Sequence, residues 1–279
     1  MNKIISILLL ACLPIFLQAQ LVCTLKDKQL CESHLEGIQQ TPMPPSMGDM
    51  AIAIGQRFLG TPYVAKTLEL GMEEDLVVNL QGLDCTTFLE NVVVMSRLWK
   101  KNALHFEAFQ KELEFLRYRD GKRAGYPSRL HYFTEWLTNN EKKGIIKNIT
   151  AELGGKPIDK QINFMSTHRS AYMQLKGEEN YQAIQAVEKA NEELDPCYIP
   201  KEEIREKEQL IKDGDLIALS TNIKGLDVVH VGIAIHQNGR LHLLHASTGS
   251  NKVEISAKPL AEYMSTKRVQ NGIMVARLM

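Results

Sequence analysis

The chain has 279 residues, and its 33 lysines and arginines are balanced by 33 aspartates and glutamates. A chain without net charge and without a long block of Lys or Arg has no field to attract nucleic acid or an anionic membrane. We therefore expect neither as a partner. Residues 1–19 combine a short basic start, an apolar run and a small-residue cleavage pattern, Leu17-Gln18-Ala19. This pattern is typical of a secretory signal peptide and predicts export to the periplasm.

A second interpretation of the leader is lipid attachment at Cys12. Leu9-Leu10-Ala11-Cys12 resembles a lipoprotein cleavage box, but it lies inside the apolar run rather than at its end. The signal peptide of residues 1–19 is therefore the favoured prediction, followed by a single domain over residues 20–279. No later segment is apolar enough to cross a membrane, which takes roughly 20 residues.

Four cysteines remain after residue 19, namely Cys23, Cys31, Cys85 and Cys197. Cysteines in an oxidising compartment either form disulfides or have a reason not to. Cys23 and Cys31 lie close together in a polar stretch, where a small disulfide is one of two open possibilities. The sequence leaves the pairing of Cys197 undecided.

The pattern of apolar residues predicts helices first and strands afterwards. A helix is expected over about 47–59, ended by the stop signals of Gly60-Thr61-Pro62-Tyr63. The region from about 86 to 211 is expected to be mostly helical, with exposed, charged helices over 181–194 and 202–211. Helical spacing is clearest for Phe88, Val92, Met95 and Trp99, and for Phe106, Phe109, Leu113 and Leu116.

After Gly214 the pattern changes to short strands separated by turn residues. They are expected over 216–219, 228–235, 240–247, 252–255 and 273–278. Helices followed by antiparallel strands predict an α+β fold, in which the sheet packs on the helix that begins near Cys85.

Cys85 is a candidate nucleophile because it opens this apolar helix, with Asp84 or a neighbour as the cap. The unpaired amides and the dipole of a helix N-terminus lower the pKa of a cysteine and can receive an oxyanion. We therefore expect a reactive thiol at Cys85. Such a nucleophile also needs a base, for which histidine is the usual residue.

A hairpin argument selects the base among the eight histidines. Asn238-Gly239 favours a type I′ turn, which places His230 and His245 on one face of the two strands and His242 on the other. Gly232 would lie opposite His245 and leave the gap between the imidazoles open. The second histidine can then orient the first, as catalysis by a base requires. A slip of one residue would reverse this result.

Two other interpretations compete with the catalytic one. A cysteine at a helix start is commonly a small buried residue, and a histidine in an apolar strand is commonly part of the core. Two histidines on one face could also bind a metal, but no His-x-x-x-His or Cys-x-x-Cys pair accompanies them. No metal and no cofactor is therefore expected.

Five motifs occur in an order that resembles a known superfamily. They are Gly60-Thr61-Pro62-Tyr63, Leu83-Asp84-Cys85-Thr86-Thr87-Phe88, Gly214-Asp215-Leu216-Ile217, His230-Val231-Gly232-Ile233-Ala234-Ile235 and Leu244-His245-Ala246-Ser247-Thr248. Together they resemble the NlpC superfamily of cell-wall cysteine peptidases and amidases, which are permuted relatives of papain. The resemblance covers about 46–99 and 210–279.

The resemblance implies a papain-like core in which Cys85 is the nucleophile, His230 the base and His245 the residue that orients it. It also implies that Tyr63 lies beside the nucleophile, where it contacts substrate or an oxyanion. The chain departs from the common pattern in the long segment between Tyr63 and Cys85. It departs again in an inserted region, about 100–210, that the minimal fold lacks.

The inserted region carries further candidate substrate-binding residues. Arg129 can form paired hydrogen bonds with a carboxylate, and Tyr132 could stack on a sugar face. The polar residues Ser166, Thr167 and His168 interrupt a helical stretch, so we include them, although capping or surface roles fit each of them singly.

Within the superfamily, the chain resembles one branch in particular. This resemblance implies an N-acetylmuramoyl-L-alanine amidase that acts on anhydromuropeptides, so peptidoglycan fragments are the expected substrate. A γ-D-glutamyl-diaminopimelate endopeptidase is the alternative, because the motifs around the nucleophile do not separate the two bonds. A non-catalytic peptidoglycan-binding module is a remote third possibility, since it would not need Cys85, His230, His245 and Tyr63 together. The oligomeric state does not follow from the sequence.

Overall fold

The computed structural model describes residues 20–279; the expected signal peptide and Cys12 lie outside the described residues. The helices are α1 (Leu25–Gln39), α2 (Met47–Arg57), α3 (Cys85–Lys101), α4 (Phe106–Arg117), α5 (Phe133–Lys142), α6 (Phe164–Thr167), α7 (Glu178–Ala190), α8 (Ile204–Lys207) and α9 (Leu260–Ser265). The strands are β1 (Leu21–Cys23), β2 (Leu76–Val78), β3 (Ile146–Asn148), β4 (Lys156–Pro157), β5 (Cys197–Pro200), β6 (Leu216–Thr221), β7 (Val228–Gln237), β8 (Arg240–Ser247), β9 (Lys252–Ile255) and β10 (Gln270–Leu278).

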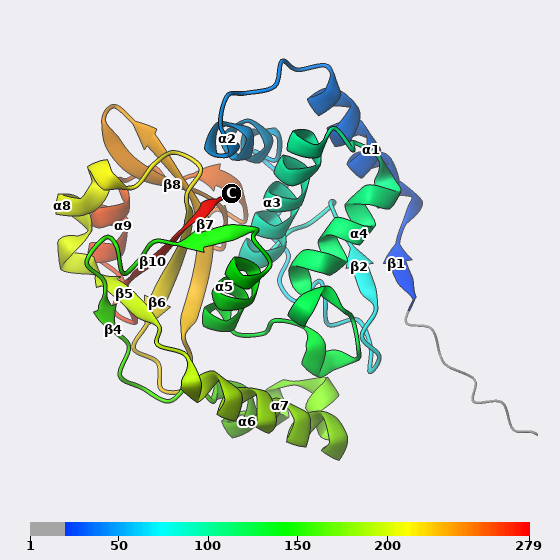
Figure 1. Ribbon diagram of the computed structural model, residues 1–279, viewed down its shortest axis with the longest axis vertical. Coiled ribbons are helices and arrows are strands. Elements are labelled where there is room, and N and C mark those ends of the chain that lie inside the picture. Colours follow the sequence, from blue (N-terminus) through cyan, green and yellow to red (C-terminus); the bar gives the residue numbers. More distant parts are fainter. Residues whose placement is uncertain (1–19) are drawn as a thin grey trace, which may run out of the picture.

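An antiparallel sheet organises the fold. Its strands follow the order β4-β5-β10-β6-β7-β8-β9, and β3 also pairs with β10. Helices α2, α3 and α5 lie on one side of this sheet, and α8 and α9 lie on the other (Figure 1). The predicted mixture of helices with an antiparallel sheet is therefore confirmed.

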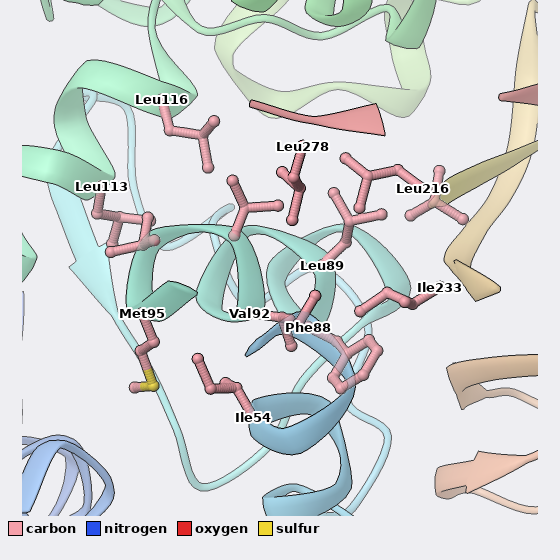
Figure 2. Packing of buried hydrophobic residues seen from close by; sticks show 14 of the residues in the cluster. Ile54, Phe88, Leu89, Val92, Met95, Leu113, Leu116, Leu216, Ile233 and Leu278 are labelled. Carbon is pink, nitrogen blue, oxygen red and sulfur yellow. The ribbon is translucent and has the colours of Figure 1, made fainter. Parts of the chain in front are cut away.

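Helix α3 is the centre of the larger hydrophobic core. Its side chains meet Ile54 of α2, Leu113 and Leu116 of α4, and Leu216, Ile233 and Leu278 of the sheet (Figure 2). Phe88, Leu89, Val92 and Met95 are fully buried. Burial of each such side chain contributes about 1.5–3 kcal/mol, so the position of this helix is strongly determined.

A capping box fixes the first turn of α3. The carboxylate of Asp84 accepts the backbone N–H of Thr87 at 2.8 Å, and the Thr87 hydroxyl accepts the backbone N–H of Asp84 at 3.0 Å. These bonds satisfy amides that a helix start leaves without partners. Cys85 is thereby held at the first position of a rigid helix.

The region of residues 100–210 is more closely joined to the fold than the sequence indicates. We expect it to be mostly helical, and α4, α5 and α7 agree. However, β3 and β5 pair with β10 and so belong to the main sheet. Because apolar residues of α4 and α5 also line the α3 core, this region completes the core instead of being appended to it.

The N-terminal stretch also differs from expectation. It forms α1, whose residues Cys31, Leu35 and Ile38 are buried at helical spacing. Cys23, Cys31, Cys85 and Cys197 are all free thiols. The possible disulfide between Cys23 and Cys31 is therefore not formed.

No helix within residues 20–279 combines the length and apolar character that a membrane span requires.

The contact between Gly214 and Gly48 fixes the first turn of α2 against the start of β6. A Cβ atom at Gly214 would lie 2.2 Å from the Gly48 Cα atom, whereas one at Gly239 would meet nothing within 4 Å. Both glycines have positive φ, +83° at Gly214 and +75° at Gly239, so alanine would strain the backbone to a similar extent at the two positions. We predict that Gly214→Ala lowers the free energy of unfolding by about 1–3 kcal/mol more than Gly239→Ala. Urea denaturation checks this, and equal losses would contradict the close-contact argument.

Candidate active site

The turn that contains Tyr63 is bound on two sides. The backbone N–H of Tyr63 donates to Asn251 O at 2.9 Å, and the backbone N–H of Val64 donates to Leu83 O at 3.1 Å. The turn therefore links β9 to the segment that leads into Cys85. Tyr63 is thereby paired with Leu83, two residues before Cys85, and its role beside a nucleophile stays a prediction.

The β7–β8 hairpin has the predicted register. Ile235 pairs with His242 and Gln237 with Arg240. Asn238 and Gly239 both have positive φ, 51° and 75°, as a type I′ turn requires. The turn chemistry therefore determined which histidines share a face.

The two predicted histidines are in direct contact. His230 Nε2 and His245 Nδ1 are 2.6 Å apart, and the rings are nearly perpendicular, at 85°. The other nitrogen of His230, Nδ1, takes no part in this contact. A Cβ atom at Gly232 would lie 2.8 Å from Leu243 Cδ1, so packing requires glycine there. That the missing side chain also leaves the gap between the imidazoles open stays a prediction.

The Cys85 side chain contacts the backbone of β7. The N–H of Val231, the residue after His230, hydrogen-bonds the Cys85 sulfur. Val231 points into the core beneath the sheet, and His230 points to the opposite face. Cys85 thus lies against the β7 backbone at the residue that follows His230.

The electrostatics of the site favour neutral groups. Burial raises the pKa of the Cys85 thiol to about 11, and the Asp84 carboxylate adds to this, against the opposing hydrogen bonds from Val231 and Thr86. Burial lowers the pKa of His230 to about 3 and of His245 to about 4, with a smaller contribution from the positive charge of Lys267. Burial therefore opposes the expected lowering of the thiol pKa by the helix N-terminus.

Tyr263 of α9 is a site residue that the sequence did not reveal. Its ring meets His245 edge to face, with centroids 5.8 Å apart, and Lys267 lies 4.8 Å from its centroid. The charge of Cys85 also acts on its hydroxyl. No spacing or motif distinguishes Tyr263, because α9 reaches the histidines only through the packing of the second core.

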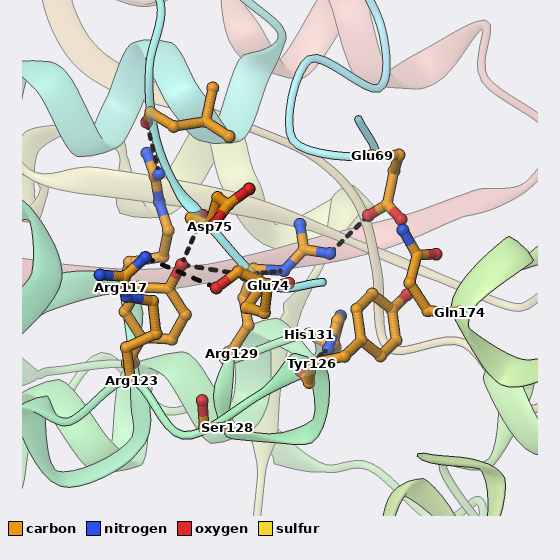
Figure 3. Close-up of polar contacts among 12 residues, drawn as sticks. Glu69, Glu74, Asp75, Arg117, Arg123, Tyr126, Ser128, Arg129, His131 and Gln174 are labelled. Carbon is orange, nitrogen blue, oxygen red and sulfur yellow. Dashed lines mark hydrogen bonds and ion pairs between the residues drawn. The ribbon is translucent and has the colours of Figure 1, made fainter. Parts of the chain in front are cut away.

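A pocket of about 460 Å³ opens beside the nucleophile. Asp84 and Thr86, on either side of Cys85 in the chain, contribute to its wall, and the predicted residue Arg129 lies in it. Arg129 is 7% exposed and pairs with Glu69 and Glu74 (Figure 3). The expectation that Arg129 belongs to the site therefore agrees with its position.

The other predicted binding residues lie elsewhere. Tyr132 is 2% exposed, and its hydroxyl donates to Glu188 at 2.7 Å, so it cannot stack on a sugar. Ser166 lines a separate hollow with Glu188 and Lys189. Thr167 and His168 are exposed, and the His168 ring stacks on the Phe164 ring with their centroids 3.9 Å apart. All four belong to the packing around α6, which the polar sequence did not indicate.

Within residues 20–279, no three His, Cys, Asp or Glu side chains are grouped so as to hold a metal ion.

A family model described as AmiA-like, N-acetylmuramoyl-L-alanine amidase-like, matches residues 53–273. The chain belongs to this amidase-like family. Since the match spans residues 100–210, the region that completes the α3 core is part of the family's own architecture.

Solved structures share the fold. An N-acetylmuramoyl-L-alanine amidase from Bacteroides uniformis is 36% identical, covers 84% of this chain and 99% of its own, and has a TM-score of 0.80. A Bacteroides fragilis protein provisionally named a xylanase is 39% identical, covers 80% and 99%, and has a TM-score of 0.76. A Legionella pneumophila protein is 21% identical, covers 91% and 95%, and shares the fold with a TM-score of 0.67. The comparison with curated proteins gave no match.

The lowered histidine pKa values predict a loss of stability in acid. In the unfolded chain the His230 side chain takes up a proton near pH 6.5, but in the folded protein its pKa is about 3. The stabilisation is thus complete above pH 6.5 and lost as the pH falls towards 3. Between pH 6.5 and pH 4 we predict that the free energy of unfolding of wild type falls by up to about 3 kcal/mol more than that of His230→Gln. This follows from about 1.4 kcal/mol per pKa unit. Urea denaturation at several pH values checks this, with exposed His168→Gln as control. An identical pH dependence in wild type and His230→Gln would contradict it.

Proposed function

We propose that this amidase-like protein hydrolyses the N-acetylmuramoyl-L-alanine bond of peptidoglycan fragments, with Cys85 as nucleophile. The observation that carries the proposal is the hydrogen-bonded pair of His230 and His245, together with a cysteine at the start of a buried helix that lies against the β7 backbone next to His230. Membership of the amidase-like family and the likeness to a Bacteroides uniformis amidase support the choice of bond.

The reaction begins from a neutral thiol and a neutral imidazole. With the shared proton on His230 Nε2 and donated to His245 Nδ1, the lone pair of His230 Nδ1 takes the thiol proton as sulfur attacks the lactyl carbonyl. His230 then gives that proton to the departing L-alanine nitrogen, leaving a thioester. A water molecule, deprotonated by His230, hydrolyses the thioester and restores the thiol.

Tyr63 and the backbone amide of Cys85 are proposed to stabilise the oxyanion. Burial, reinforced by the charges of Cys85 and Asp84, raises the pKa of Tyr63 to about 12, so its hydroxyl stays protonated and able to donate. A donor held by the bound turn is pre-organised, which is the requirement for oxyanion stabilisation.

Three further features form part of this proposal. The core is of the papain-like NlpC type, as the order of the five motifs implies. The protein is exported to the periplasm after removal of residues 1–19. Its substrates are released fragments such as anhydromuropeptides, because the region 100–210 adds walls around the pocket.

Glycoside hydrolysis, which the name of one neighbour would suggest, is not favoured by the pocket. That chemistry uses two carboxyl groups facing the sugar bond. Here Asp84 is bound within the helix cap, Glu69 pairs with Arg129, and Glu90 pairs with Arg117. Each acid of the pocket therefore already has a partner in the free protein, and no two of them are left to face a sugar bond.

The bond that is cut can be read from products by mass spectrometry. Wild type incubated with intact and anhydro muropeptides should release stem peptides that begin at L-alanine. Cys85→Ala should lose at least about a thousandfold in rate, because the nucleophile is removed. Cys197→Ala, which removes another free thiol, should retain activity.

Retained turnover in Cys85→Ala would refute the cysteine mechanism. Products in which L-Ala-D-Glu remains on the sugar would instead identify the endopeptidase activity.

Tyr263 is predicted to position His245. Tyr263→Leu should lower kcat by about tenfold to a hundredfold with little change in KM, since misplacement of a catalytic group by about 1 Å has this effect. Tyr263→Phe, which keeps the ring, should retain most of the rate. Steady-state kinetics on a muropeptide checks both variants, and equal kcat values for Tyr263→Leu and wild type would show that the ring does not position the histidine.

A further inference from the structure

The pocket beside Cys85 has apolar walls and a charged floor. Leu68, Leu130, Tyr172 and Met173 form apolar wall. At the floor, Arg117 binds Glu90 at 2.8 Å and donates to Val77 O, so its partners are fixed. Arg129 is the second buried cation, and its partners differ in how firmly they are held.

Two carboxylates approach the Arg129 guanidinium from opposite sides (Figure 3). Glu74 lies 3.2 Å from Nε, is almost fully buried, and also accepts the hydroxyl of Tyr118 at 2.9 Å. Glu69 lies 2.5 Å from Nη2, but 26% of its side chain is exposed. Glu74 is therefore enclosed by the protein, whereas Glu69 forms the hydrogen bond to Arg129 from a position that water reaches.

The segment that carries Glu69 is held over the pocket by a second contact. Gln174 donates its side-chain N–H to Gly71 O at 2.8 Å. Gln174 is 2% exposed, and its Oε1 atom is buried without a hydrogen-bond partner. The same segment exposes Leu70 and Met72 to solvent. A buried acceptor without a partner at this position indicates that the free protein leaves hydrogen-bonding capacity for a ligand.

We infer that Glu69 occupies, on Arg129, the place of a carboxylate of the stem peptide, and that substrate binding exchanges one for the other. This inference rests on the proposed function for the identity of the ligand. Arg129 and Gln174 then bind the ligand, while residues 65–73 move with Glu69.

The charges of the pocket favour an exchange. The described lining residues include three cations, Lys66, Arg117 and Arg129, and three acids, Glu69, Asp84 and Glu90. Addition of an anion without loss of Glu69 would bury an excess negative charge, and loss of Glu69 alone would leave Arg129 under-neutralised. Replacement of one carboxylate by another keeps the buried charge constant.

Binding to the inactive Cys85→Ala protein tests the exchange without turnover. The probes are muramoyl-L-alanyl-D-glutamate with both carboxyls free and the same compound with both carboxyls amidated. In the Cys85→Ala background, Glu69→Gln should lower the Kd of the diacid by about tenfold, because a neutral amide competes less well for Arg129. The Kd of the diamide should stay unchanged. Glu73→Gln, an exposed residue of the same segment, removes the same charge and should alter neither Kd.

Arg129→Lys should abolish the preference for the diacid, and a thermal melt will show whether that variant is folded. Isothermal titration calorimetry supplies the Kd values. An unchanged ratio of diacid to diamide Kd in Glu69→Gln would overturn the exchange, as would a diacid that binds no better than the diamide to the Cys85→Ala parent.

The proposed function is judged separately by products formed with Cys85 present. Cleavage of the muramoyl-alanine bond together with an unchanged Kd ratio would overturn the exchange alone. Tighter diacid binding by Glu69→Gln without such cleavage would support the pocket and overturn the assigned bond.

Discussion

Helix α3 is buried on all sides, between the sheet, α2 and α4, and the position of its first residue determines the rest of the site. Its apolar side chains leave no freedom to rotate or slide, because each change would open a cavity in a close-packed core. The capping box then holds Cys85 at the one end of the helix that reaches the pocket. The Tyr63 turn and the β7 backbone are both arranged around this fixed point.

Burial also sets the chemistry of the site. A low-dielectric setting stabilises the neutral thiol of Cys85 and the neutral rings of His230 and His245. Under the proposed cysteine mechanism, attack by sulfur is coupled to transfer of its proton, instead of starting from a stored ion pair. An orienting histidine suits this mechanism, because it holds one tautomer of His230 without adding a negative charge to the buried site.

The region of residues 100–210 contributes the other half of the pocket. It supplies Arg117, Arg129 and, in the segment just before α7, Gln174. It also adds β3 and β5 to the sheet and completes the core around α3. Structural and binding roles are thus combined in the same elements, and a family match through this region is the expected consequence.

Local signals explain which predictions were confirmed. The helix of Phe88, Val92 and Met95 has a clear period, and the strands after Gly214 alternate between well-marked turns. The hairpin was predictable because Asn238-Gly239 permits positive φ at both central residues, which sets the register and places His230 beside His245. These features depend on residues near one another in the chain.

Other features depend on which segments pack together, and no local pattern encodes that. Tyr132 has the composition of a binding residue, yet the packing of α6 and α7 buries it. Tyr263 and Glu69 reach the site from distant segments without a motif. The sequence by itself therefore determined the helix start at Cys85, the histidine pair and the α+β class, through periodicity and turn chemistry. Only the tertiary structure decided the pocket, its charge pairs and the raised thiol pKa, because burial and long-range contacts exist only after the chain has folded.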